Sequence, residues 1–182
     1  MRVIGGNAKG KRLGCPNVKG NIRPLSEQVR EALFNILMPV VDGARFLDLF
    51  AGTGAVGIEA LSRGAKLAFF AEHDRRTVNF IRANLAATGF TEQAEVYALL
   101  VNKALNILTG KGAQFDIIFL GAPYDDPALE EALKVLGDSA LIAPKGIVIA
   151  EHRTKHPLDE VFGALKRYRR AKYGDTTLSF YE

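Results

Sequence analysis

The sequence predicts an α/β fold in which helices flank a mostly parallel sheet that ends in an antiparallel hairpin. Over most of the chain, short apolar segments alternate with helical patterns, which is typical of parallel strands joined by crossover helices. One apolar segment, 45–50, runs directly into a glycine-rich turn and a further helix. Near the end of the chain, Gly174-Asp175 separates two strand-like segments, which is a hairpin signal.

The first 22 residues are expected to form a basic N-terminal arm, 1–22. Its core would be a small β-hairpin, with strands at 2–5 and 11–13 and a glycine-containing turn between them. The rest of the arm, 15–21, is rich in glycine and polar residues and is expected to be a loop.

A first helix is expected after Pro24 and before Pro39. Ser26 can cap its N-terminus, and apolar residues at helical spacing give it one buried face. That face consists of Val29, Leu33, Phe34 and Leu37.

The remaining elements alternate as an open α/β sheet requires. Strands are expected at 45–50, 66–71, near 95–99, at 115–120 and at 146–151. Helices are expected between them at 55–63, 75–87, around 102–108 and at 127–136. The hairpin strands are 168–173 and 176–181. No repeat or linker interrupts the pattern, so we expect a single domain over 1–182.

The turn after residues 45–50 is the most informative feature for function. Gly52, Gly54 and Gly57 follow the predicted strand, so the backbone can turn sharply and approach a ligand at the helix N-terminus. Glu72 lies about 20 residues further on, at the end of the next strand, where an acid can grip a ribose. The spacing indicates a nucleoside-containing cofactor, and by itself it also fits a nicotinamide enzyme.

Asp48 favours one cofactor over the others. A carboxylate just before the glycine turn repels a pyrophosphate, whereas it suits the positively charged amino and sulfonium groups of S-adenosylmethionine. The pattern Asp48-x-Phe50-x-Gly52-x-Gly54 is similar to the first motif of class I methyltransferases. A buried aspartate that only caps the following turn is the simpler alternative.

Composition argues against several classes of protein. Of 182 residues, 48% are hydrophobic and 24% are charged, as in an ordinary globular protein. No apolar run approaches the length of a membrane span, and residues 1–13 contain no apolar signal core. The single Cys15 fits a reducing compartment, so we expect a cytoplasmic protein without a membrane partner. His73, His152 and His156 have no metal-ligand spacing with that cysteine, so no metal is expected.

Positive charge is concentrated near both ends of the chain. Residues 1–30 contain seven Lys and Arg against one acid, and residues 152–172 contain seven against two. Basic ends around a more acidic middle indicate a polyanionic partner, most simply nucleic acid. The alternative is that these charges are solvated faces that keep the protein in solution.

Several separate blocks, in the same order and over nearly the whole length, share a pattern with one known family. The blocks are Arg2-Val-Ile-Gly-Gly with Lys9-Gly-Lys, Arg23-Pro24 with Val29–Asn35, Asp48–Gly54, Glu59–Gly64 and Lys172–Thr176. The chain resembles the small bacterial methyltransferases that act on guanine N2 in 16S ribosomal RNA. The resemblance implies a Rossmann-like class I methyltransferase fold and S-adenosylmethionine as cofactor. It implies ribosomal RNA or the small ribosomal subunit as partner.

The resemblance also implies site residues. Gly52 and Gly54 would lie at the amino-acid end of the cofactor, and Glu72 on its ribose hydroxyls. Where the family has a Gly-Asp pair that contacts the adenine, this chain has Ala98-Leu99. The whole expected cofactor site is Asp48, Phe50, Gly52, Thr53, Gly54, Glu72, His73 and Leu99. The residues expected to hold RNA phosphates are Arg2, Lys9, Lys11, Arg12 and Arg23.

The catalytic block departs from the family pattern. Members carry Asp/Asn-Pro-Pro-Tyr/Phe after the fourth strand, and the corresponding residues here are Gly121-Ala122-Pro123-Tyr124. The family's acid or amide and a backbone carbonyl accept the N–H hydrogens of a guanine amine, whose lone pair is otherwise delocalised into the ring. Tyr124 can still stack on a flipped base, and the carbonyls of Gly121 and Ala122 can accept hydrogen bonds. The side-chain acceptor is missing, and Asp125 or Asp126 is a candidate substitute.

Two functions of different class follow from this departure. The first is methylation of guanine N2 in small-subunit ribosomal RNA, with the target base flipped toward Tyr124. The second is a catalytically weak or inactive relative that binds RNA and cofactor. Methylation of another nucleobase amine is a further alternative. No feature of the sequence indicates the oligomeric state, and a monomer is taken as the default.

Overall fold

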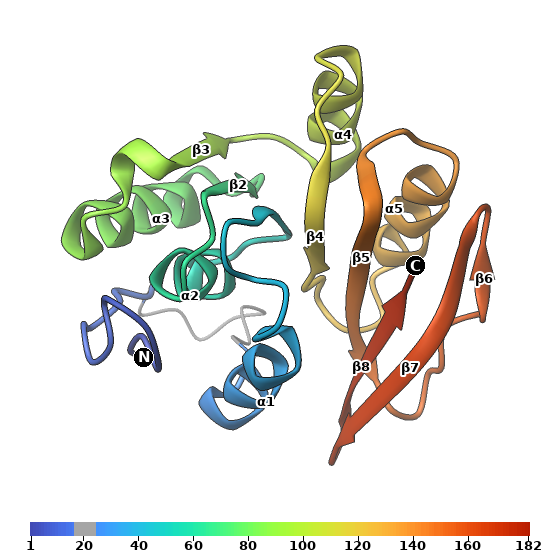
Figure 1. Cartoon of the computed structure of the whole chain (residues 1–182), viewed down its shortest axis with the longest axis horizontal. Helices are drawn as coiled ribbons and strands as arrows, with labels where there is room; N and C mark the ends of the chain where they lie inside the picture. Colours follow the sequence, from blue (N-terminus) through green and yellow to red (C-terminus); the bar gives the residue numbers. More distant parts are fainter. Residues whose placement is uncertain (17–24) are drawn as a thin grey trace.

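The structure, a computed structural model, describes residues 1–16 and 25–182, and this part of the chain contains one eight-stranded sheet with helices on both faces (Figure 1). The helices are α1 (Glu27–Leu37), α2 (Ala55–Ser62), α3 (Arg75–Thr88), the short 3-10 helix η1 (Thr91–Gln93), α4 (Val101–Gly110) and α5 (Ala128–Gly137). The strands are β1 (Arg45–Leu49), β2 (Leu67–Ala71), β3 (Ala94–Tyr97), β4 (Phe115–Leu120), β5 (Ile142–Arg153), β6 (Val161–Phe162), β7 (Leu165–Tyr173) and β8 (Thr176–Tyr181).

The strand order confirms the predicted α/β sheet. Across the sheet the strands follow the order β3-β2-β1-β4-β5-β8-β7-β6. The first five of these are parallel, and β8 lies antiparallel between β5 and β7. The chain moves outward from β1 to β3 and then returns to place β4 on the other side of β1. This reversal leaves a crevice at the carboxyl ends of β1 and β4, which is where open α/β sheets bind their ligands.

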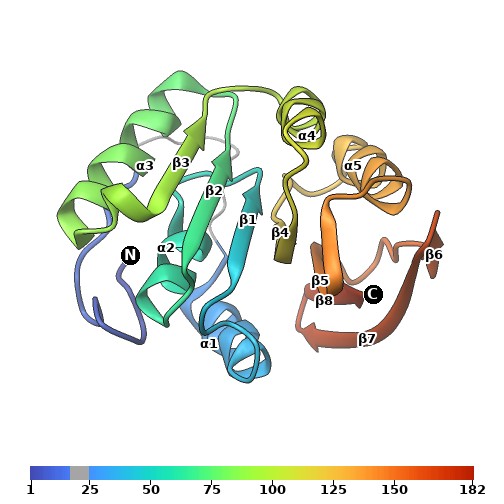
Figure 2. The ribbon, with the colours of Figure 1, turned by 45° about the horizontal axis from the view of Figure 1, so that its top comes forward.

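Two hydrophobic layers hold the helices on the sheet. One face of the strands, with Phe46, Phe70 and Ile117, packs against α1, α2 and α3. The other face, with Leu47 and Ile118, packs against α4 and α5. Figure 2 shows the two groups of helices on opposite sides of the sheet. Because both faces of the central strands are covered, those strands appear in the sequence as nearly continuous apolar runs.

Three strands differ from the prediction, and one of them is β7, which begins at Leu165 rather than at Tyr168. β5 begins at Ile142 rather than at Gly146, because the register with β4 shifts between Phe115 and Ile117 and the earlier residues still pair. The additional residues, 142–145, include Lys145 with a left-handed backbone conformation. Their apolar and polar side chains therefore do not alternate in sequence as they do in a regular strand. The two-residue strand β6 is too short to give a sequence signal.

The predicted N-terminal hairpin is present, but it packs on the domain rather than projecting from it. Arg2 and Arg12 form an antiparallel bridge, and the side chains of Val3, Ala8 and Leu13 are buried in the same core layer as α2. The part of the expected arm at 17–22, and the Arg23 that follows it, lie outside the described residues.

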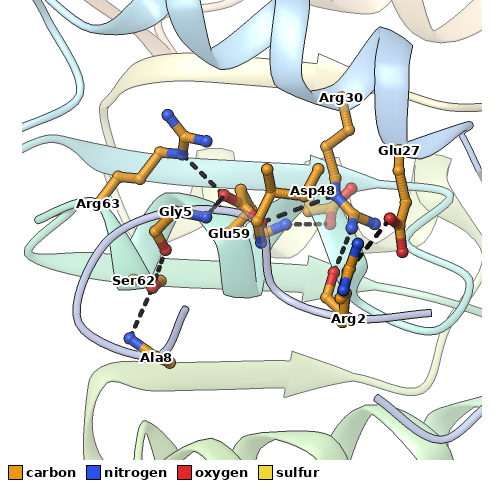
Figure 3. Close-up of polar contacts among 11 residues, drawn as sticks. Arg2, Gly5, Ala8, Glu27, Arg30, Asp48, Glu59, Ser62 and Arg63 are labelled. Carbon is orange, nitrogen blue, oxygen red and sulfur yellow. Dashed lines mark hydrogen bonds and ion pairs between the residues drawn. The ribbon is translucent and has the colours of Figure 1, made fainter. Parts of the chain in front are cut away.

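A buried ion cluster fastens this hairpin (Figure 3). Both carboxylate oxygens of Glu59 on α2 accept backbone N–H groups of the hairpin, from Ile4 and Gly5 at 2.8 Å each. Arg30 of α1 is completely buried, donates to the carbonyl of Arg2 and lies 3.7 Å from Glu59. The cluster therefore ties the hairpin to α1 and α2, and the expected basic arm is a fixed surface over residues 2–13.

Candidate active site

The main cavity of the molecule lies at the carboxyl ends of the parallel strands. It has a volume of about 690 Å³ and is lined by the turn after β1, the turn after β2, the loop after β4 and the end of β5. Its lining includes Asp48, Phe50, Gly52, Thr53, Glu72, His73, Gly121, Ala122, Pro123, Tyr124, Glu151 and Arg153. The structure therefore brings the predicted cofactor turn and the predicted catalytic block to the wall of one cavity.

The turn after β1 requires glycine at two positions. Gly52 and Gly54 have φ of 55° and 76°, in the left-handed region where a side chain is unfavourable. No atom lies within 4 Å of where a Cβ of Gly52 would be, so a ligand can approach the backbone there. Gly57 has a different role, because a Cβ would lie 2.3 Å from the ring of Phe70; it lets α2 pack closely on β2.

Glu72 organises the glycine turn. Its Oε2 accepts the N–H of Gly52 at 3.0 Å, and its Oε1 accepts the N–H of Asp74 at 2.9 Å. His73 lies beside it, with Nδ1 3.3 Å from Oε1. Because an ionised carboxylate has about four acceptor positions, Glu72 can hold this turn and still accept hydrogen bonds from the hydroxyls of a ribose.

Asp48 lies at the turn after β1 and also at the wall of the main cavity. Only 1% of the residue is exposed, and Oδ2 accepts the N–H of Gly57 at 2.8 Å, so it caps the following helix. It also lines the cavity. Burial, and to a lesser degree the charge of Glu72, raises the pKa of Asp48 to about 8. A cation in the cavity would oppose that shift by favouring the ionised carboxylate.

The loop after β4 holds Tyr124 by its hydroxyl group. This hydroxyl donates to Glu151 Oε1 at 3.1 Å, and it lies 2.6 Å from the hydroxyl of Thr176. Because a carboxylate can only accept, the Thr176 hydroxyl is left to donate to the phenol oxygen. The guanidinium of Arg153 lies 5.2 Å from the centre of the Tyr124 ring. The aromatic ring of the predicted catalytic block is thus fixed at the cavity wall.

The two candidate substitutes for the missing acceptor have other partners, so the structure gives this expectation no support. The carboxylate of Asp125 pairs with His156 and, at 3.3 Å, with Arg153, a residue that lines the main cavity. The carboxylate of Asp126 accepts the N–H of Ala128 at 2.9 Å and so caps the start of α5. Among the described residues, neither aspartate lines the main cavity.

Leu99 is also separate from the cavity. It is half-buried in the connection between β3 and α4, and it is not among the described residues that line the main cavity. The other expected cofactor residues either line the cavity or, like Gly54, lie in the turn that forms it.

Glu151 is one of the residues lining the cavity that the sequence analysis did not select. It is 8% exposed and lies on β5, next to the loop after β4. Its Oε2 is 3.8 Å from where a Cβ on Gly121 would lie. Tyr124 and Glu151 also line two smaller cavities next to the main one, of about 450 and 340 Å³. A signal was present in hindsight, since Glu151, like Glu72, is an acid at the carboxyl end of an apolar strand.

Four of the expected RNA-binding residues, Arg2, Lys9, Lys11 and Arg12, lie on the hairpin and do not line the main cavity, whereas Arg23 is outside the described residues. Lys9 and Arg12 are exposed, and Arg2 lies 3.5 Å from Glu27. Lys11 differs, because its ammonium donates to the carbonyls of Ala87 and Thr88 at the end of α3. Lys11 is therefore partly committed to holding the hairpin on the domain.

In the described ranges, no group of three His, Cys, Asp or Glu side chains is arranged to bind a metal ion. Over the same ranges, no helix is long and apolar enough to cross a membrane.

Comparisons with known proteins agree with this geometry. The model of the family described as "Conserved hypothetical protein 95" matches residues 1–182. YlbH of Bacillus subtilis is 36% identical over 100% of this chain and 98% of its own length. The ribosomal RNA small subunit methyltransferase D of Escherichia coli is 34% identical, over 100% of this chain and 89% of its own length.

Solved structures show the same architecture. A hypothetical protein of Thermus thermophilus superposes with a TM-score of 0.86 at 32% identity, covering 100% of this chain and 99% of that one. An RNA methyltransferase from Salinibacter ruber, in complex with S-adenosyl-L-homocysteine, superposes with a TM-score of 0.66. It covers 87% of this chain and 92% of its own, and at 17% identity it supports the class I methyltransferase fold alone. The full-length family match and these identities show that the chain belongs to the "Conserved hypothetical protein 95" family and is a relative of the small-subunit ribosomal RNA methyltransferases D.

Proposed function

We propose that this protein transfers a methyl group from S-adenosylmethionine to the N2 amine of a guanine in the 16S RNA of the small ribosomal subunit. The observation that carries the proposal is the single crevice that joins the Gly52 turn and Glu72 to the loop containing Tyr124. The similarity to the ribosomal RNA small subunit methyltransferase D of Escherichia coli supports small-subunit ribosomal RNA as the substrate.

The residues around the turn after β1 fit the cofactor. Glu72 can accept from the ribose hydroxyls, and the open backbone at Gly52 can approach the amino-acid part. Asp48 supplies a negative group below the turn for the positive charges of the cofactor. When bound, S-adenosylmethionine supplies an activated methyl group on a sulfonium.

The loop after β4 fits a nucleobase that has been taken out of its stack. Tyr124 offers an aromatic surface that its hydrogen bonds to Glu151 and Thr176 hold in place. A base lying on this ring would present its exocyclic amine across the crevice from the Gly52 turn. Lys9 and Arg12 would contact RNA phosphates at the hairpin surface. With ribosomal RNA as substrate, we expect the protein in the cytoplasm.

A relative that binds RNA and cofactor without transferring a methyl group is the second candidate. The absence of a side chain at Gly121 and the short side chain of Ala122 favour it, because the family acceptor is missing there. The two candidates differ in one measurable property, the transfer itself.

The experiment that separates them is methyl transfer from labelled S-adenosylmethionine to unmodified small ribosomal subunits, with large subunits as the control. The proposed enzyme labels the 16S RNA of small subunits and leaves the large subunits unlabelled. Folded protein that binds both S-adenosylmethionine and small subunits, yet transfers no label, would refute the enzyme and support the binding module.

A further inference from the structure

We propose that Glu151 is a catalytic residue that accepts a hydrogen bond from the target amine and then takes its proton. This inference rests on the proposed function, because it needs an amine substrate in the main cavity. It assigns to the fifth strand a role that residue 121 cannot fill in this chain, because Gly121 has no side chain.

The sheet register puts Glu151 on the correct face. Asp48 pairs with Phe70 on one side and with Phe119 on the other, and Phe119 pairs with Ile149. Two residues further along a strand, a side chain returns to the same face. Glu72, Gly121 and Glu151 lie two residues beyond Phe70, Phe119 and Ile149. They therefore lie on the same face at the carboxyl ends of β2, β4 and β5, with Gly121 next to Glu151 and with the end of β1 between Glu72 and Gly121.

On this face, the carboxylate of Glu151 lies beside the space where the side chain of residue 121 would begin. A Cβ at position 121 would be 3.8 Å from Glu151 Oε2, and it would be 2.9 Å from Cε1 of Phe119. An acceptor is therefore present next to the loop carbonyls of Gly121 and Ala122, although it comes from a different strand. The sequence of the catalytic block, Gly121–Tyr124, gives no sign of this acceptor, because Glu151 lies outside the block.

Tyr124 both positions Glu151 and links it to the substrate. The Tyr124 hydroxyl donates to Oε1 of Glu151, and Oε2 is the oxygen that faces Gly121. Since the residue is only 8% exposed, its hydrogen bonds form in a poorly solvated environment where they are stronger than in water. A base stacked on Tyr124 would therefore bring its amine to a carboxylate that the same tyrosine holds.

Atoms and charge balance in the proposed step. The amine nitrogen uses its lone pair to form a bond to the methyl carbon, and the sulfur–carbon bond breaks with its electron pair left on sulfur. The nitrogen then carries a positive charge and one proton too many. That proton moves to the carboxylate of Glu151, which leaves a neutral methylated amine and a neutral acid. No other reactant is needed.

The test compares Glu151→Gln with Glu92→Gln in transfer to small subunits. Glu92 is an exposed residue of η1 that lines none of the three cavities described above, so its variant makes the same change of charge without changing a cavity wall. Gln at 151 keeps the size of the side chain and an oxygen for the Tyr124 hydroxyl, but it cannot take a proton as a carboxylate does. We expect kcat to fall by about 10²–10³-fold in Glu151→Gln, with the Kd for S-adenosylmethionine within about threefold of wild type. Glu92→Gln should retain the wild-type rate.

The outcomes are distinguishable. Wild-type activity together with less than about threefold loss in Glu151→Gln would overturn the role of Glu151 and leave the proposed function intact. If the fall in kcat of Glu151→Gln comes with a lower melting temperature and a weaker affinity for S-adenosylmethionine, the role of Glu151 is structural. That result would also overturn the proposal. If the wild-type protein transfers no methyl group, the proposed function fails and this inference fails with it.

Discussion

The carboxylate of Glu72, at the end of β2, accepts a hydrogen bond of 3.0 Å from the backbone N–H of Gly52, in the turn after β1. The acid at the end of one strand therefore fixes the glycine turn at the end of its neighbour. A single ligand in the main cavity can therefore contact both Glu72 and the backbone at Gly52, which joins two sequence signals into one candidate site.

This bond predicts that Glu72→Ala weakens the binding of S-adenosylmethionine by about 10–100-fold. The variant removes the carboxylate that accepts the N–H groups of Gly52 and Asp74 and that is expected to accept from the ribose hydroxyls, and a lost hydrogen bond to a charged group costs about 1.5–3 kcal/mol. Calorimetric titration measures the affinity, with Glu92→Ala on the exposed helix η1 as the control. Equal affinity in both variants would remove Glu72 from the cofactor site.

Asp48 predicts how stability depends on pH. An unfolded chain releases the Asp48 proton near its ordinary pKa of 3.8, whereas the folded protein holds it up to about pH 8. Between these values the unfolded state has lost the proton and the folded state has kept it, so stability falls as pH rises from about 4 to about 8. Below about pH 4 the whole contribution is present, and above about pH 8 it has been lost.

The variant Asp48→Asn isolates this effect. Asn stays neutral and can still accept the N–H of Gly57. Compared with wild type, we expect similar stability at about pH 4 and a gain of up to about 5 kcal/mol at about pH 9, measured by urea unfolding of the ligand-free protein. Stability curves that run parallel over this whole range would contradict burial of an ionisable Asp48 in this state.

Tyr124 predicts a separation between rate and cofactor affinity. Tyr124→Ala removes the stacking surface and should lower the rate of methyl transfer by about 100-fold, because base stacking on an aromatic ring is worth about 1–3 kcal/mol. Tyr124→Phe keeps the ring but loses the bonds to Glu151 and Thr176, so a smaller loss is expected. Both variants should bind S-adenosylmethionine within about threefold of wild type. Full activity in Tyr124→Ala would eliminate the stacking role.

Position 121 tests whether the catalytic block has degenerated. If Glu151 is the acceptor, Gly121→Asp places a second carboxylate beside it and forces the ring of Phe119 to shift, so no gain in rate is expected. Gly121→Ala is the matched control, since it makes the same Cβ contacts without a charge. The measurement is the single-turnover rate of methyl transfer in the two variants and in the wild type. A gain of tenfold or more in Gly121→Asp alone would show that residue 121 is a lost catalytic position.

The sheet and its helices were predictable because strands buried on both faces are apolar throughout and several helices carry an apolar stripe. In α1 the sequence also offered a cap, and the structure shows the Ser26 hydroxyl accepting the N–H of Val29. Arg30 shows the limit of such reasoning. A charged residue in a helix is normally expected at the surface, yet Arg30 is completely buried because Glu59 and the hairpin lie against it.

The candidate site was predictable on its cofactor side and only partly on its substrate side. The turn from Asp48 to Gly54 is local in sequence, so its spacing carries the geometry. Glu151 is 30 residues beyond Gly121 in the chain, and only the pairing of β4 with β5 makes them neighbours. The expected substitutes, Asp125 and Asp126, are close in sequence but are turned away by the path of the loop.

The most direct test of the account is to identify the nucleoside formed when the wild-type protein acts on unmodified small subunits with labelled S-adenosylmethionine. Digestion of the RNA and mass spectrometry of the nucleosides give the answer. The account predicts label in N2-methylguanosine of the 16S RNA at a single position. Label in a methylated adenosine, or on a ring atom or ribose, would contradict it.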